Sequence, residues 1–153
     1  MTSPLSAADL YHVGVVVADF DAALQRLSAA GGYRWTQTME YTVPVVTADG
    51  PADIPFKLAY SLQAPHLEIV QEVPGSLWVS APRNATHHLG YWADDVAATG
   101  AALEELGYTL EVRAAGDGPP PFAYYLDPLG IRIELVQRSM FGDWPQFLQQ
   151  LKK

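Results

Sequence analysis

The two halves of this chain carry the same short motifs in the same order. His-Val-Gly at residues 12–14 is matched by His-Leu-Gly at 88–90, Ala-Ala-Leu at 22–24 by the same tripeptide at 101–103, and Leu-Glu-Ile-Val-Gln at 67–71 by Ile-Glu-Leu-Val-Gln at 133–137. A repeat that spans about half the chain lets each unit complete its core against its twin. The chain should therefore fold as two copies of one module.

The hydrophobic pattern predicts the same elements in each half. Short β-branched and aromatic runs indicate strands, and Asp19 and Asp94 or Asp95 are candidate N-caps for one helix per half. The predicted elements of the first half are strands at 11–17, 35–43, 56–62 and 66–72, with a helix around 22–27 and a polar loop at 46–55. Those of the second half are strands at 87–93, 109–113, 122–126 and 131–137, with a helix around 101–108. We thus expect an α+β fold of two tandem βαβββ modules, at 8–75 and 86–138, within a single domain covering 1–153.

A further helix is predicted at the C-terminus, at residues 143–152, with Trp144 and Pro145 in its first turn. The spacing of Trp144, Phe147, Leu148 and Leu151 gives this helix one apolar face. That face could dock on the barrel or on another subunit. The oligomeric state is therefore open, and we favour a homodimer.

Composition excludes several classes of protein. The 153 residues carry a net charge of −8 with only nine Lys and Arg, so a nucleic-acid partner is not expected. There is no cysteine, which rules out disulfides, thiolate metal sites and a cysteine nucleophile. We see no signal peptide and no apolar run of the roughly 20 residues that a membrane span needs. A cytoplasmic protein that acts on a small molecule is the expectation.

Each half contributes one histidine in its first strand and one glutamate in its last strand. These are His12 and Glu68, and His88 and Glu134. Glutamate within an apolar strand is rarely buried without a charged partner or a metal. Two imidazoles and two carboxylates suit one divalent ion, Zn, Ni, Co, Mn or Fe(II). No other cofactor is indicated.

Aromatic residues in the strands are candidates for the wall of a substrate pocket, although such residues also serve as ordinary core. The candidates are Tyr60, Trp92, Phe122 and Tyr124. His87 should point to the opposite face of its strand from His88, as a packed or surface histidine.

These motifs resemble the vicinal oxygen chelate superfamily (glyoxalase, bleomycin resistance and dioxygenase proteins) up to about Arg138. The most specific is Asp-Pro-Leu-Gly at 127–130, a tight turn before the strand that carries Glu134. The resemblance implies an open, cup-shaped mixed β-sheet barrel in which His12, Glu68, His88 and Glu134 hold one metal ion. Substrates of such proteins usually chelate the ion through two neighbouring oxygens.

Within the superfamily, the chain is most similar to the branch of methylmalonyl-CoA epimerase and glyoxalase I. It departs from the epimerase pattern because residues 56–61 contain no acid that could act as a separate base, and no basic cluster for CoA phosphates is visible. Our leading hypothesis is an isomerase, epimerase or lyase in which Glu68 or Glu134 removes a proton beside a carbonyl of a fairly apolar substrate. The alternatives are an extradiol-type ring-cleaving dioxygenase and a non-catalytic ligand-binding or resistance protein.

Overall fold

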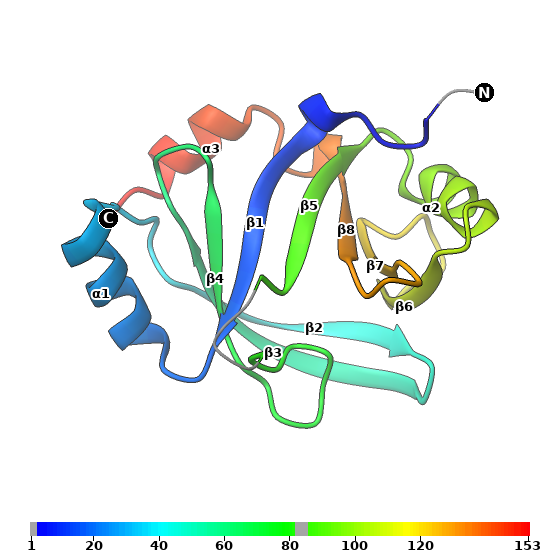
Figure 1. Ribbon diagram of the computed structural model, residues 1–153, viewed down its shortest axis with the longest axis horizontal. Helices are drawn as coiled ribbons and strands as arrows, with labels where there is room; N and C mark the ends of the chain where they lie inside the picture. The colour runs from blue at the N-terminus through cyan, green and yellow to red at the C-terminus, as the bar shows by residue number, and fades with distance from the viewer. Residues whose placement is uncertain (1–2, 82–85) are drawn as a thin grey trace. The chain divides into compact units, whose positions relative to one another are not determined.

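The computed structural model describes residues 3–81 and 86–153 (Figure 1). The first half contains β1 (Leu10–Val17), α1 (Phe20–Gly31), β2 (Met39–Thr47), β3 (Gly50–Tyr60) and β4 (Leu67–Gln71). The second contains β5 (His88–Ala93), α2 (Val96–Glu105), β6 (Thr109–Ala114), β7 (Phe122–Leu126) and β8 (Arg132–Gln137). Short 3-10 helices, η1 (Ala7–Asp9) and η3 (Arg138–Met140), flank these strands, and α3 (Trp144–Gln150) ends the chain.

All eight strands form one mixed sheet whose hydrogen-bonded order closes on itself. The order is β1-β4-β3-β2-β6-β7-β8-β5, that of a closed barrel. The predicted fold class, an α+β fold with a mixed barrel and a C-terminal helix, is confirmed. The βαβββ order occurs twice, while the module bounds 8–75 and 86–138 stay a prediction.

The chain divides into two compact units that do not coincide with the two halves of the sequence. Unit 1 holds the chain up to Tyr11, the segment Val43–Asp53 and the segment His88–Met140. Unit 2 holds His12–Thr42, Ile54–His87 and Phe141–Lys153. The residues at 43–53 therefore belong to the unit that contains most of the second half.

In unit 2, α1 covers one face of β1 and β4. Asp19 caps the helix by accepting a hydrogen bond from the Ala22 N–H, and Gly32 ends it in the left-handed conformation with φ 70°. Phe20, the first residue of α1, packs in a core with Val17, Trp35, Ala59 and Ile69. β1 and β4 are parallel neighbours, and β3 pairs with β4 in the antiparallel sense.

In unit 1, α2 covers the equivalent face of β5, β7 and β8. Asp95 is the N-cap, which decides between the two candidates, and its carboxylate accepts a hydrogen bond from the Ala98 N–H. The core between helix and sheet consists of Ala93, Val96, Leu103, Ala123, Tyr125, Ile133 and Leu135. β5 and β8 are parallel, and β7 pairs with both β6 and β8 in the antiparallel sense.

The polar loop predicted at 46–55 is wrong, because β2 and β3 continue through most of it. Only a short turn separates Thr47 from Gly50, and the Thr47 hydroxyl closes it by donating to the Gly50 carbonyl and accepting from the Asp49 N–H. Gly50 adopts φ 112°, which favours glycine. Pro51 and Pro55 lie within β3.

The C-terminal helix is shorter than predicted. Asp143 caps α3 by accepting from the Gln146 N–H, and the helix ends at Gln150, before the two terminal lysines. Pro145 lies in the first turn, as expected. No helix in the described part of the chain is long and apolar enough to cross a membrane.

Candidate metal centre

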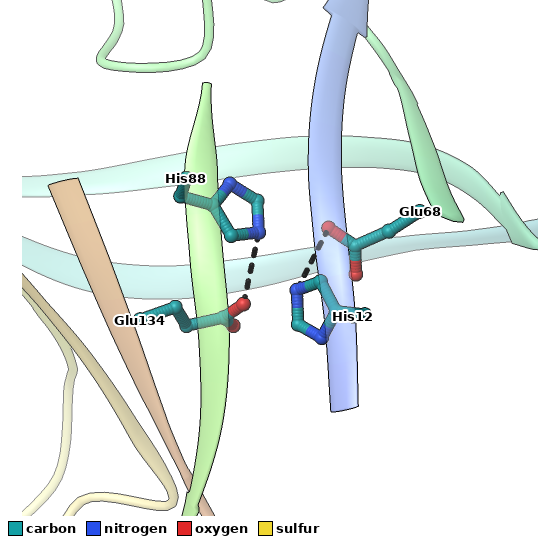
Figure 2. Close-up of side chains that lie close together, drawn as sticks. All are labelled: His12, Glu68, His88 and Glu134. Atoms are coloured by element: carbon teal, nitrogen blue, oxygen red, sulfur yellow. Dashed lines mark ion pairs between the residues drawn. The ribbon is translucent and has the colours of Figure 1, made fainter. Parts of the chain in front are cut away.

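The first histidine–glutamate pair lies within unit 2, on the sheet face opposite α1. Gly14 of β1 is the register partner of Glu68 in β4, so His12 lies near Glu68 on the neighbouring strand. Val15 and Val17 pack towards α1, and strand alternation therefore directs His12 to the other face. His12 is 1% exposed and Glu68 5% exposed, and His12 Nε2 lies 3.9 Å from Glu68 Oε1 (Figure 2).

The second pair repeats this arrangement within unit 1. Gly90 of β5 is the register partner of Glu134 in β8, just as Gly14 is of Glu68. Ile133 and Leu135 pack in the core under α2, which leaves Glu134 on the opposite face. His88 is 1% exposed and Glu134 8% exposed, and His88 Nε2 lies 3.1 Å from Glu134 Oε2 (Figure 2).

A tight turn delivers Glu134 to this position. The Asp127 carboxylate accepts a hydrogen bond from the Leu129 N–H at 2.7 Å, and the Asp127 carbonyl accepts one from the Gly130 N–H at 2.8 Å. Gly130 adopts φ 91°, a conformation that other residues rarely take. The Asp-Pro-Leu-Gly motif thus fixes where β8 begins.

The donor atoms of each pair fit a divalent ion in chemistry and approximately in spacing. Two ligand atoms with metal bonds of about 2.1 Å lie about 3.0 Å apart at a right angle and about 3.4 Å apart at the tetrahedral angle. The 3.1 Å separation of the His88–Glu134 pair falls in this range, and the 3.9 Å of the His12–Glu68 pair needs a small side-chain adjustment. Imidazole and carboxylate are donors that Zn, Ni, Co, Mn and Fe(II) accept.

Each pair has a tyrosine at the same register position. Tyr60 is the partner of Glu68 on β3, and Tyr124 is the partner of Glu134 on β7. The Tyr60 ring meets the His12 ring edge to face at 5.8 Å between centroids, and the Tyr124 ring meets the His88 ring in the same way at 5.2 Å. Both tyrosines were predicted as pocket residues, but their equivalence was not predicted. The sequence carried a signal for it, because Ala-Tyr-Ser-Leu at 59–62 and Ala-Tyr-Tyr-Leu at 123–126 match at three of four positions.

The other two aromatic pocket candidates are less closely tied to the pairs. Phe122 is half-buried and packs edge to face on Tyr124, with centroids 6.1 Å apart. Trp92 is half-buried and stacks on Tyr11, with centroids 3.7 Å apart. A role for either in substrate binding stays a prediction.

His87 belongs to a structural loop rather than to a pair. It is buried, and its Nε2 lies 3.0 Å from the Leu77 carbonyl oxygen. Nearby, the Glu72 carboxylate accepts hydrogen bonds from the Ser80 N–H and from the Ser80 hydroxyl. These two hydrogen bonds lower the pKa of Glu72. The interpretation of His87 as a packed histidine agrees with this burial.

The C-terminal helix adds an aromatic layer behind the first pair, and its contacts with Tyr60 and His66 could not be predicted from the sequence pattern. The Trp144 ring lies perpendicular to the Tyr60 ring, with centroids 5.0 Å apart, and also meets His66 edge to face. Tyr60 is therefore held between Trp144 and His12. A residue outside the repeat thus supports the first pair.

Comparison with known proteins places these features in context. A sequence model described as the Glyoxalase/Bleomycin resistance protein/Dioxygenase superfamily matches residues 9–124, which include three of the four predicted ligands. No curated protein sequence matches the chain significantly.

Solved structures with this fold include two methylmalonyl-CoA epimerases. A variant from Streptomyces coelicolor in complex with 2-nitronate-propionyl-CoA is 18% identical, with a TM-score of 0.59 over 84% of this chain and 96% of that one. The Mycobacterium tuberculosis protein is 20% identical, with a TM-score of 0.58 over 90% of this chain and 92% of that one. At these identities the likeness shows the fold alone.

Proposed function

Because this chain belongs to the Glyoxalase/Bleomycin resistance protein/Dioxygenase superfamily, we propose that it is a metal-dependent isomerase, epimerase or lyase. It would remove a proton next to a carbonyl group of a small, fairly apolar substrate. The observation that carries this proposal is the pair of equivalent, buried histidine–glutamate sites at matching register positions.

In this proposal the two pairs act as one site, with His12, Glu68, His88 and Glu134 holding a single divalent ion. Chain connectivity supports it. The His87 N–H donates to the Gly14 carbonyl at 2.8 Å, and His88 is the next residue along the chain. All four side chains are buried and together offer a donor set suited to a metal ion.

When bound, a divalent ion would act as a Lewis acid that polarises a substrate carbonyl and makes the neighbouring C–H bond more acidic. The chain itself would supply the base, either Glu68 or Glu134. His88 Nε2 holds Glu134 Oε2 at hydrogen-bond distance, whereas Glu68 Oε1 lies 3.9 Å from His12 Nε2 and is less constrained by its partner. Buried apolar neighbours such as Val16 and Leu58 would limit the access of water.

The substrate we propose differs from that of the methylmalonyl-CoA epimerases with the same fold. Residues 54–60 of β3 contain no carboxylate, and the buried positions of β3 are occupied by Ile54, Phe56, Leu58, Ala59 and Tyr60. These residues therefore provide no separate carboxylate base beside the first pair. This favours a reaction that uses a single carboxylate base on a substrate with an apolar body.

The first test is metal content, measured by inorganic mass spectrometry on tag-free protein. We expect about one divalent ion per chain, lost in Glu134→Gln and His88→Ala but kept in Glu105→Gln, a matched change at an exposed position on α2. If reconstituted protein binds no metal and the two site variants fold normally, the enzyme proposal is wrong. A ligand-binding protein of the same fold would then be the better interpretation.

The reaction class needs a second assay. Proton abstraction beside a carbonyl exchanges hydrogen for deuterium in D2O, which NMR detects in a panel of ketones, thioesters and 2-hydroxycarbonyl compounds. Exchange that depends on both the metal and a glutamate would support the proposal. Consumption of oxygen with a catechol, and no exchange, would instead identify a ring-cleaving dioxygenase.

A further inference from the structure

Unit 2 contains a groove that plays no part in the proposed metal centre. It lies between α1, the segment that follows α1 and the C-terminal residues, and Figure 1 shows the C-terminus beside this helix. Its volume of about 710 Å³ is within the range of small-molecule sites in proteins. The question is what ligand its lining would recognise.

The backbone around the groove is held in place by hydrogen bonds. Thr36 forms an isolated antiparallel bridge with Lys152, the Gln37 N–H donates to the Leu151 carbonyl, and the Lys153 N–H donates to the Trp35 carbonyl. Arg34 is fixed in the same way, since its N–H donates to the Gln63 side chain and its carbonyl accepts from the Leu62 N–H. These bonds bring the C-terminal lysines next to Arg34, although the two segments lie far apart in the sequence.

The lining is strongly cationic for so acidic a chain. The protein has nine Lys and Arg and a net charge of −8, yet three of the nine, Arg34, Lys152 and Lys153, line this groove, and no Asp or Glu does. Three other cations are paired with carboxylates, in the pairs Lys57–Asp21, Arg132–Glu111 and Arg138–Asp9. In the described part of the chain, none of the three groove cations forms such a pair. Three like charges around one groove repel one another, and an anion would relieve that repulsion.

Half of the remaining lining residues are apolar or aromatic, and the other half are the uncharged polar residues Gln25, Ser28, Thr36 and Thr38. Leu24 and Leu62 line the groove together with the rings of Tyr33 and Trp35, whose centroids lie 5.7 Å apart. Trp35 is oriented by a hydrogen bond from its indole N–H to the Ser28 hydroxyl. A small inorganic anion would leave these apolar surfaces without a partner.

We propose that this groove binds a phosphate monoester with an apolar or aromatic body. Arg34 would bind the phosphate through two parallel N–H donors, and the two lysines would add point charges. The organic part would lie against the rings and leucines. The proposal does not depend on the proposed function, because it concerns residues outside both histidine–glutamate pairs.

The test is binding of phenyl phosphate, measured by isothermal titration calorimetry with EDTA present, so that a bound metal plays no part. We expect one saturable site that weakens as salt is added. Phenol and inorganic phosphate, each carrying only half of the recognised chemistry, should bind more weakly. Amide NMR shifts on titration should cluster at residues 33–38 and 152–153.

Variants locate the site. Arg34→Gln should weaken binding by roughly 2- to 5-fold, and the triple change Arg34→Gln, Lys152→Gln, Lys153→Gln by about 10- to 100-fold. Arg26→Gln removes one positive charge from an exposed position of α1 outside the groove and should leave the affinity unchanged. No saturable binding, or the same affinity in the triple variant as in the parent, would overturn the proposal. If the triple variant does not fold, the comparison of Arg34→Gln with Arg26→Gln decides.

Discussion

Gly100→Ala tests how α2 is seated on the sheet that carries the second histidine–glutamate pair. Gly100 is buried in the middle of α2, and a Cβ atom added there would lie 1.9 Å from the Tyr125 Oη and 2.6 Å from its Cζ. Ordinary contact begins at 3.4 Å, so the phenol would have to move by about 1.5 Å. Tyr125 is only 5% exposed and is packed in the core of unit 1, so this movement disturbs its neighbours.

The expected magnitude follows from two opposing effects. Replacing a helical glycine by alanine would by itself stabilise the helix by about 1 kcal/mol. Overpacking of a core costs about 1–3 kcal/mol, and the very short contact places this case at the upper end. We therefore expect a net loss of about 2 kcal/mol in the free energy of unfolding. For a chain of this length that lowers Tm by roughly 4–8 °C.

The assay is thermal and urea unfolding of the parent, Gly100→Ala and a matched control. Gly118→Ala is the control, because a Cβ at that position meets no atom within 4 Å and the residue has no positive φ. Its stability should be unchanged or slightly higher. Tyr125→Phe removes the 1.9 Å contact but not the 2.6 Å one, so in combination with Gly100→Ala it should rescue part of the loss.

Metal content gives a second readout. Tyr125 faces α2, whereas its neighbour Tyr124 contacts His88 on the opposite face of β7. Gly100→Ala should therefore lower stability without changing the amount of metal bound per folded chain. A Gly100→Ala protein as stable as the parent would refute the packing of α2 on Tyr125.

Three further predictions concern the bound metal, Trp144 and Glu72. Removal of the metal with a chelator should lower Tm, since an ion at about 100 times its Kd stabilises the fold by about 2.7 kcal/mol; unchanged melting would contradict a buried metal centre. Trp144→Ala should cost about 3–5 kcal/mol and expose Tyr60, while Trp144→Phe should cost much less, as measured by chemical unfolding. Hydrogen bonds from Ser80 lower the pKa of Glu72, so this carboxylate contributes stability above its unfolded pKa and loses it as pH falls through the folded pKa. Ser80→Ala should raise the pKa of Glu72 part-way towards its ordinary value in an NMR titration, because the backbone donor remains; no change would show that the hydroxyl bond is absent in solution.

The repeat in the sequence was enough to predict the order of strands and helices and the two histidine–glutamate pairs. The structure shows that Val15 and Val17 pack towards α1, and strand alternation therefore directs His12 to the face away from the helix. Boundaries were less accurate where local signals conflicted. Residues 46–55 were predicted as a polar loop, but β2 and β3 form most of this segment, and only a compact turn closed by Thr47 separates them.

The sequence by itself determined which residues are the candidates for metal binding, since an acid inside an apolar strand must be explained by a partner. Only the tertiary structure decided what stands next to them. The equivalence of Tyr60 and Tyr124 depends on the register of β3 with β4 and of β7 with β8. The cationic groove depends on a bridge between Thr36 and Lys152. Such contacts join residues far apart in the chain, and their free energy depends on the packing of the whole unit, which no local pattern of residues encodes.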